Sequence, residues 1–110
     1  MAKKLCAYCF LKRNYLARYA FMAQNDYIIN PYFTAPEMRG KGLAKRILKV
    51  AVNQVPYSDV WAVVKSENIP SIRALEATGF VHVGYSHQRK WSHRLGTSKS
   101  DLLVFCHRAD

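Results

Sequence analysis

The N-terminal third of the chain alternates short apolar runs with polar turns, a pattern typical of β-strands. The runs predict strands over residues 5–11, 15–23 and 27–34, and we expect the first two to pair as a hairpin. Pro31 lies within the third run. Because proline has no N–H to donate to a neighbouring strand, we expect an edge, a bulge or a point where two strands part at this residue.

The spacing changes after residue 42, where apolar side chains recur at intervals of three and four. This spacing predicts an amphipathic helix over residues 43–55. The continuous apolar run 60–64 predicts a buried parallel strand. A second helix is expected from Asn68, a favourable N-cap, to Gly79, which can end a helix in the left-handed conformation. The apolar positions of the first helix are Leu43, Ala44, Ile47, Leu48, Ala51, Val52 and Val55.

The C-terminal part adds two apolar runs and one polar stretch. The runs predict strands over residues 80–85 and 101–107, and the basic stretch 88–100 is interpreted as a long loop or an irregular hairpin. The order of three strands, helix, strand, helix and two strands predicts an α+β fold with a mixed, mostly antiparallel sheet and two helices. A length of 110 residues suits one domain, so residues 1–110 are predicted to form a single domain.

Composition adds a strong positive charge to this picture. Half of the residues are apolar, and 17 Lys and Arg against 7 Asp and Glu give a formal net charge of +10. The apolar content predicts a packed core rather than disorder. The charge indicates an anionic partner such as a phosphorylated small molecule or nucleic acid, and a basic surface without a partner is the alternative. No run approaches the roughly 20 apolar residues of a membrane span, so no membrane partner is expected.

The three cysteines and four histidines do not form the pattern of a metal site. Cys6 and Cys9 lie three residues apart in a predicted strand, so their side chains are expected on opposite faces. Together with Cys106 they are interpreted as buried thiols of a protein in a reducing cytoplasm. No pair of histidines has the spacing of metal ligands, so no metal is expected, and His87 could act as a base.

The segment APEMRGKGLAKRILK, residues 35–49, places Gly-Lys-Gly directly before the first predicted helix. The free N–H groups of a first helical turn carry positive partial charge, and most helices have Asp or Glu there. A phosphate or pyrophosphate bound at this turn would satisfy both the N–H groups and nearby cations. The alternative is a glycine turn followed by a solvated basic helix face. The nearby cations are Arg39, Lys41, Lys45 and Arg46.

Two segments resemble the GNAT superfamily of N-acetyltransferases. PEMRGKGLA resembles its motif A, Q/R-x-x-G-x-G/A, with Arg39, Gly42 and Ala44 at the three fixed places. NIPSIRALEATGF, residues 68–80, resembles the motif B helix, and VHVGY follows as the next strand of the family does. The resemblance covers about Leu5 to Phe105. It implies the GNAT-like acyl-CoA N-acyltransferase fold, in which two parallel strands splay apart at the CoA cleft.

The resemblance implies acetyl-CoA as cosubstrate and assigns residues to it. Backbone groups of Phe33 and Thr34, at the end of the third strand, would bind the pantetheine arm. Asn68 and Ser71 match positions that commonly contact the pantetheine arm or the thioester. The residues whose backbone would hold the pyrophosphate are Arg39, Gly40, Lys41, Gly42, Leu43 and Ala44.

The implied reaction is transfer of the acetyl group to a primary amine, while the catalytic residues stay unknown. Leu75 occupies the place of the family's usual motif B tyrosine, so no general acid can be assigned. Ile28 and Asn30 occupy strand positions that often hold a glutamate base, so no base can be assigned either. Asp26, Asn30 and Tyr32 are expected to share a strand face toward the cleft, and Asn30 and Tyr32 are candidate acceptor-binding residues.

The resemblance also implies a truncated domain. Family members usually begin with a strand and two helices that wall the acceptor site, whereas this sequence starts almost at the second strand. Either the wall is missing, or another subunit or protein supplies it. A homodimer is one hypothesis, and a monomer at high concentration in size-exclusion chromatography with light scattering would contradict it. The alternative functions are a non-catalytic CoA-binding module and, less favoured, a basic nucleic-acid-binding protein.

Overall fold

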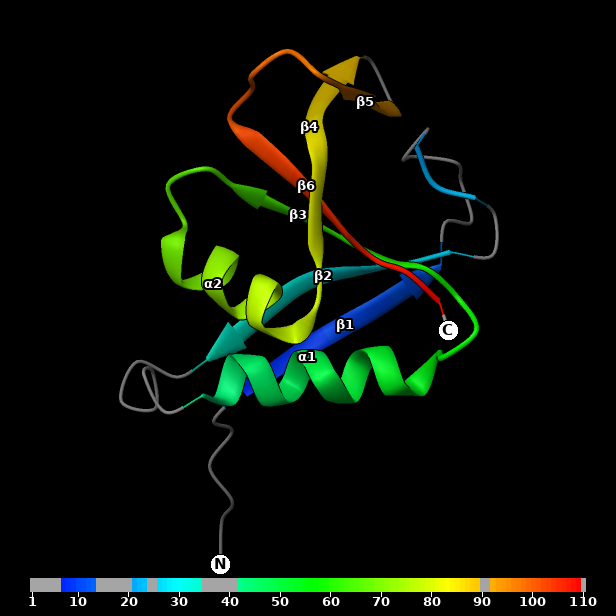
Figure 1. Ribbon diagram of the computed structural model, residues 1–110, viewed down its shortest axis with the longest axis vertical. Coiled ribbons are helices and arrows are strands. Elements are labelled where there is room, and N and C mark those ends of the chain that lie inside the picture. The colour runs from blue at the N-terminus through cyan, green and yellow to red at the C-terminus, as the bar shows by residue number, and fades with distance from the viewer. Residues whose placement is uncertain (1–6, 14–20, 24–25, 35–41, 90–91, 110) are drawn as a thin grey trace, which may run out of the picture.

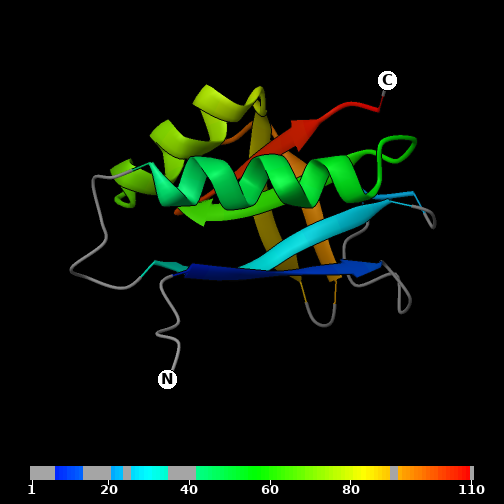
Figure 2. The same ribbon diagram turned by 90° about the horizontal axis from the view of Figure 1, so that it is seen from below.

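Six strands form one sheet, and two helices lie on the same face of it (Figure 1, Figure 2). The computed structural model describes the backbone of residues 7–13, 21–23, 26–34, 42–89 and 92–109. The strand order is β1-β2-β3-β6-β4-β5, and every neighbouring pair is antiparallel except β2 with β3. In chain order the elements are β1 (Ala7–Arg13), β2 (Tyr27–Thr34), α1 (Leu43–Gln54), β3 (Val60–Lys65), α2 (Ile69–Thr78), β4 (Val81–Arg89), β5 (Ser92–Gly96) and β6 (Leu102–His107).

This arrangement confirms the predicted mixed, mostly antiparallel sheet with two helices, but one strand differs. The antiparallel partner of β1 is β2, from Ala7 opposite Thr34 to Arg13 opposite Tyr27. The strand predicted over residues 15–23 is absent from its described part, where Phe21 begins a turn and a bend. The rest of that prediction lies outside the described residues. Aromatic-rich composition favours a strand only where a neighbour is available to pair with it.

The polar stretch 88–100 forms a hairpin rather than a long loop. β4 continues to Arg89 and pairs with β5, so the hairpin interpretation is the correct one. Ser86 and His93 are both buried, and Ser86 Oγ lies 2.7 Å from His93 Nδ1. A Cβ on Gly96 would lie 2.5 Å from His87 Cδ2, so the His87 ring packs directly on this glycine. The hairpin is therefore held by polar contacts, which hydrophobic periodicity does not reveal.

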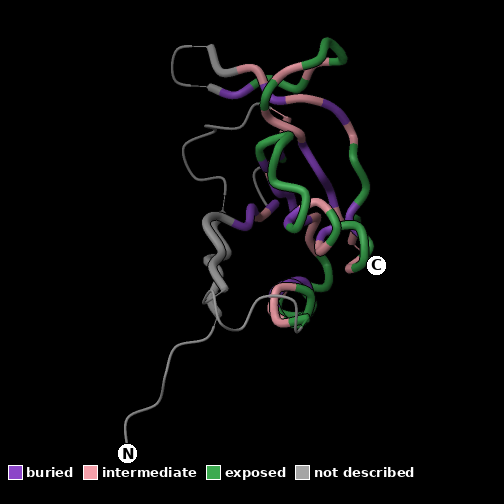
Figure 3. The backbone as a smooth tube through the Cα atoms, turned by 90° about the vertical axis from the view of Figure 1, so that its left-hand side faces the viewer, coloured by how far each residue is buried: buried purple, intermediate pink, exposed green. Residues whose placement is uncertain are grey.

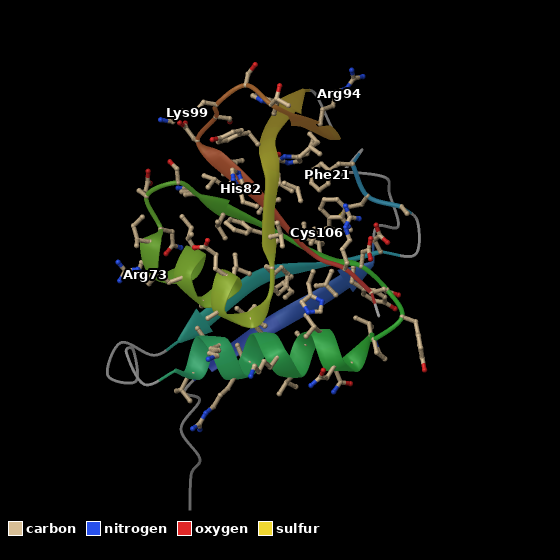
Figure 4. All side chains as sticks on the ribbon, in the orientation of Figure 1. Phe21, Arg73, His82, Arg94, Lys99 and Cys106 are labelled. Atoms are coloured by element: carbon tan, nitrogen blue, oxygen red, sulfur yellow. The ribbon has the colours of Figure 1, made fainter. Side chains whose placement is uncertain are left out.

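The core has two parts, one on each face of the sheet. The buried stretches of the chain are purple in Figure 3. The larger part fills the space between the sheet and the two helices. The smaller part includes Trp61, with Phe21 packed against it at a ring-centroid distance of 5.1 Å. Phe21 and Cys106, which belong to this second part, are labelled in Figure 4. The larger part contains Ile29, Leu48, Ala51, Val52, Val60, Ala62, Val64, Leu75, Phe80 and Phe105.

Cys106 is a free, buried thiol, as its apolar neighbourhood in the sequence predicts. Burial raises its pKa to about 11, because the surrounding apolar groups disfavour the charged thiolate. Cys106 therefore acts as a packing residue rather than a nucleophile at neutral pH. Cys6 and the side chain of Cys9 lie outside the described residues. In the part of the chain that the structure describes, no helix is long and apolar enough to cross a membrane.

Asp59, just before β3, ties the C-terminal end of the chain to the sheet. Its carboxylate accepts hydrogen bonds from the Ala109 backbone N–H at 2.8 Å and from Arg108 Nη1 at 2.9 Å. The N–H of Ala109, followed by the Arg108 guanidinium, lowers the pKa of Asp59 below its ordinary value of 3.8. The Arg108 guanidinium also lies 5.6 Å from the centroid of the Trp61 ring.

We expect Asp59→Asn to reduce the free energy of unfolding by about 1 kcal/mol at pH 7, because the variant weakens two hydrogen bonds near the surface. A lowered folded-state pKa makes this contribution complete above the ordinary pKa of Asp. The contribution should disappear as the pH falls through the lowered pKa, so variant and wild type should converge once the pH is below that lowered pKa. Urea unfolding at several pH values measures this difference. An equal difference at all pH values would contradict the electrostatic explanation.

Candidate functional site

The two parallel strands separate at their carboxyl ends. β2 pairs with β3 only through Tyr27–Val60, Ile28–Trp61 and Ile29–Ala62, yet β2 continues to Thr34 and β3 to Lys65. Beyond this point β2 pairs only with β1, and β3 pairs only with β6. The arrowheads of β2 and β3 diverge on the left of Figure 1. The backbone edges that face each other there have no strand partner among the described residues, so they can hydrogen-bond a ligand.

A β-bulge in β2 lies where the two strands separate. Cys9 of β1 is opposite Tyr32, whereas Leu11 is opposite Ile29, so β2 contains one residue more than β1 between these pairs. Pro31 is in this stretch, which confirms the prediction of a bulge or a parting of strands at the proline. A bulge bends its strand and increases the local twist. The bulge therefore turns the end of β2 away from β3.

The N-terminus of α1 begins beside this opening with unsatisfied N–H groups. Gly42 is its N-cap, in the left-handed conformation with φ 77° and ψ 13°, and no side chain caps the helix. The first intrahelical bond runs from the Arg46 N–H to the Gly42 carbonyl at 3.1 Å. The N–H groups of Leu43, Ala44 and Lys45 have no hydrogen-bond partner among the described residues. No acidic residue lies in this turn, so the site suits an anion from outside the chain.

The N-terminus of α2 is different because the chain satisfies it. Asn68 is the N-cap, and its side-chain Oδ1 accepts a hydrogen bond from the Ser71 N–H at 3.4 Å. The Ile69 N–H bonds the Glu67 carbonyl at 2.9 Å, and Pro70 has no N–H. Of the two helices, α1 is therefore the one that needs an anionic ligand.

Ser71 contributes a buried hydroxyl close to the end of β3. Its side chain is only 9% exposed, and its Oγ has no hydrogen-bond partner in the described part of the chain. Leaving a buried hydroxyl without a partner costs about 1–3 kcal/mol. A ligand or a water molecule that bonds this hydroxyl would remove the cost. Because α2 starts directly after β3, Ser71 and Asn68 lie on the β3 side of the opening.

The structure brings some of the predicted site residues together and leaves others undescribed. The N-terminal turn of α1 contains Gly42, Leu43 and Ala44, and the same end of the sheet has Asn68 and Ser71. The sequence analysis names Lys45 only as a nearby cation and misses its backbone N–H, which is the third free donor. Counting three residues from the N-cap glycine would have found it. Arg39, Gly40 and Lys41 lie outside the described residues, as do the side chains of Asn30, Tyr32, Phe33 and Thr34.

Asp26 does not lie in the cleft, contrary to the sequence-based expectation. It precedes β2, at the end where β2 and β3 are paired, and it is only 9% exposed. Its Oδ2 accepts hydrogen bonds from Trp61 Nε1 and from the Ala23 N–H, both at 2.9 Å. Asp26 therefore anchors the chain entering β2. The extra residue at the bulge also interrupts the regular alternation on which the shared face of Asp26, Asn30 and Tyr32 depended.

Leu75, at the position of the family's usual motif B tyrosine, packs in the core. Its side chain has 0% exposure and belongs to the larger core. His87, the histidine that could act as a base, and His82 are both bonded locally. His82 Nε2 lies 2.8 Å from the Gly84 carbonyl oxygen, and His87 Nε2 lies 3.0 Å from that of Ser98. The described residues contain no cluster of three His, Cys, Asp or Glu side chains that could hold a metal ion.

The comparison with protein families gives the class of this protein. The model of the acetyltransferase (GNAT) family matches residues 3–80. The match spans most of the chain, including the separated strands, the free N-terminus of α1 and all of α2. The chain belongs to the GNAT acetyltransferase family. The resemblance inferred from the two motifs is thereby confirmed.

Solved structures agree with this fold. Ribosomal-protein-S5-alanine acetyltransferase from Vibrio fischeri aligns with a TM-score of 0.65 at 16% identity, over 97% of this chain and 56% of that chain. Spermidine N-acetyltransferase from Vibrio cholerae, in complex with CoA and spermine, aligns with a TM-score of 0.64 at 21% identity, over 96% and 59%. A GNAT-family acetyltransferase from Bacillus anthracis aligns with a TM-score of 0.61 at 19% identity, over 94% and 58%.

The likeness is to part of each of these proteins. This chain spans less than two thirds of their lengths, at identities between 16% and 21%. A search of curated proteins found none that matches. The comparisons therefore establish the family and the fold.

Proposed function

We propose that this protein is an N-acetyltransferase that transfers the acetyl group of acetyl-CoA to a primary amine. The observation that carries the proposal is the free N-terminus of α1 at the point where β2 and β3 separate. Three backbone N–H groups without partners among the described residues, a first turn without an acidic residue and an N-cap glycine suit a pyrophosphate. Membership of the GNAT family supports the same cosubstrate.

Different groups of the chain would bind different parts of the cosubstrate. The N–H groups of residues 43–45 would hold the pyrophosphate, together with the backbone of residues 39–42. The unpaired edge of β2, up to Phe33 and Thr34, would bond the amides of the pantetheine arm as a third strand would. Asn68 and the buried hydroxyl of Ser71 would contact the arm from the β3 side. Asn30 and Tyr32 are the residues proposed to face the amine acceptor.

Acetyl-CoA would supply an acetyl thioester that an amine can attack, with CoA leaving as the thiol. An alkylamine has a pKa of about 10.4, so its proton must pass to a side chain or a chain of water molecules before attack. A backbone N–H near Thr34 would stabilise the negative charge that develops on the carbonyl oxygen. Leu75 cannot donate a proton to the departing sulfur, so that proton would come from another group or from water.

A second candidate function is a module that binds CoA without catalysis. The specific observation in its favour is Leu75, which is fully buried in the core and offers no hydroxyl group at the position of the family's usual acid. Such a module would keep the anion site at α1 and the separated strands. It would not consume acetyl-CoA in the presence of an amine.

Calorimetric titration of the protein with acetyl-CoA tests the proposal. We expect saturable binding with a Kd in the micromolar range, as is common for enzyme substrates. Release of CoA thiol, followed with a thiol reagent in the presence of a panel of peptides, amino sugars and polyamines, should then exceed the rate without amine. Binding without any amine-dependent release would favour the non-catalytic module. Absence of binding would contradict both functions.

A further inference from the structure

A second polar cavity lies at the other end of α1, away from the proposed cosubstrate site. Its volume is about 350 Å³, within the range of small-molecule sites. It lies between the C-terminal half of α1, the turn that follows it, the last residue of α2 and the end of β6. The cavity is lined by Lys49, Val52, Asn53, Val55, Pro56, Ser58, Thr78 and His107.

Several polar side chains of this cavity have no partner in the part of the chain that the structure describes. Lys49, Asn53, Ser58 and His107 make no side-chain hydrogen bond with any described residue. Thr78 is different, because its hydroxyl donates to the Ala74 carbonyl oxygen at 2.7 Å. The His107 ring is held in place by Phe80, at a centroid distance of 5.4 Å, and by Gly79, where a Cβ would lie 3.5 Å from it. The four free side chains can therefore bond a ligand.

The charge around the cavity favours an anionic group. Lys49 is the one described lining residue with a full positive charge, and the His107 ring can donate an N–H hydrogen bond to an anion. No carboxylate lines the cavity. The nearest acid along the chain, Asp59, is hydrogen-bonded to Arg108 and to the Ala109 N–H, and it also interacts electrostatically with His107. The ammonium of Lys49 thus has no acidic partner in the described part of the chain.

The C-terminal ends of the two helices add a second requirement for the ligand. Both α1 and α2 finish beside the cavity, and the last carbonyl groups of a helix carry negative partial charge. Some of them are already bonded within the chain, that of Val52 by the Val55 N–H and those of Leu75 and Glu76 by the Gly79 N–H. The remaining carbonyl groups can accept hydrogen bonds from hydroxyl groups of a ligand, and their partial charge disfavours an anion that brings no hydroxyl group. A ligand that carries hydroxyl groups next to its anionic group satisfies both the cation and the carbonyl ends.

The cavity is separate from the anion site at Gly42. Lys49 follows Gly42 by seven residues, and Asn53 follows it by eleven. At 1.5 Å per residue these side chains start about 10 and 16 Å further along the helix axis. One phosphate cannot bridge the two places. A ligand in the cavity would therefore be separate from one at Gly42.

We propose that this cavity binds a phosphorylated polyhydroxy molecule of the sugar phosphate class. Lys49 and His107 bind the phosphate. Asn53 and Ser58 bond the hydroxyl groups together with the helix carbonyl ends. This proposal does not depend on acetyl-CoA binding or on acetyl transfer, because it uses none of the residues at the opening between β2 and β3.

Two-dimensional NMR of the ¹⁵N-labelled protein, titrated with ribose 5-phosphate and in parallel with ribose, tests this proposal. We expect saturable shifts of the Lys49, Asn53, Thr78 and His107 amides with ribose 5-phosphate, and at least tenfold weaker binding of ribose. Shifts confined to Leu43 and Ala44 would overturn the proposal, because the phosphate would then occupy the other anion site. Equal binding of ribose, or no saturable shift at the cavity, would overturn it too.

A pair of charge-matched variants keeps the test specific. Lys49→Met removes the cation from the cavity and should weaken ribose 5-phosphate binding by about tenfold. Lys99→Met removes the same charge from an exposed loop at the top of Figure 4, far from α1, and should change the affinity by less than twofold. Equal loss in both variants would show a nonspecific charge effect and would overturn the assignment to the cavity. Circular dichroism checks that both variants are folded.

Discussion

Gly42→Trp should weaken acetyl-CoA binding by about 100-fold or more, equivalent to about 3 kcal/mol. Gly42 is the N-cap of α1 with a positive φ, and a Cβ built on it meets no atom of the described residues within 4 Å. The indole would therefore extend into open space beside the free N–H groups of Leu43 and Ala44, where the pyrophosphate is proposed to bind. Calorimetric titration of wild type and variant measures the change.

Gly42→Asn is the matched control for this experiment. Asparagine tolerates the left-handed conformation better than other side chains and is much smaller than tryptophan. We expect its effect on acetyl-CoA affinity to be less than tenfold. Wild-type affinity in the tryptophan variant would contradict the location of the cosubstrate. Equal losses in both variants would show that the conformation of the turn, rather than access to the N–H groups, controls binding.

Leu75→Ala should reduce the free energy of unfolding by about 2–5 kcal/mol. Leu75 has no exposed surface, and its side chain fills the space between α2, α1 and the sheet. Truncation to alanine would leave a cavity that the packed neighbours Leu48 and Phe105 can close only in part. Since the stability of a small domain is about 5–15 kcal/mol, this loss should shift the urea midpoint clearly.

Leu75→Met provides the matched control because methionine has nearly the same volume. We expect it to cost less than about 1.5 kcal/mol. A loss of less than 1 kcal/mol for Leu75→Ala would contradict the packing role. The presence of leucine at position 75 would then have to be explained by the cosubstrate site rather than by packing in the core.

The sequence predicted those features that depend on neighbouring residues. Pro31 indicated the bulge because proline lacks an N–H, and the spacing from Leu43 to Val55 predicted α1 to within one residue. Gly79 does end α2 in the left-handed conformation, with φ 101°. The unusual composition of the turn around Gly42 pointed to an anion site, which stays a prediction, and the helix begins there with a glycine N-cap and no side-chain cap.

Features that depend on distant residues could not be predicted in the same way. Asp26 bonds Trp61, which lies 35 residues away, so nothing near Asp26 indicates that its carboxylate is buried. The β4–β5 hairpin contains the buried pair Ser86 and His93, and polar residues of this kind give no apolar alternation to recognise. The cavity beside Lys49 likewise combines residues 49–58 with Thr78 and His107, which only the fold brings together.

The short parallel ladder between β2 and β3 has a consequence for the lifetime of the protein. Three residue pairs form this ladder in the described part of the chain, so β1 and β2 make one block and the other four strands make another. Besides the ladder, α1 joins the two blocks, because it packs on β1 and β2 and also against α2, which lies in the chain between strands of the second block. A ligand that binds to both blocks would hold them together, and its binding free energy would add to the free energy needed to separate them. The supply of acetyl-CoA in the cell would then govern how often the N-terminal block detaches and becomes accessible to proteases.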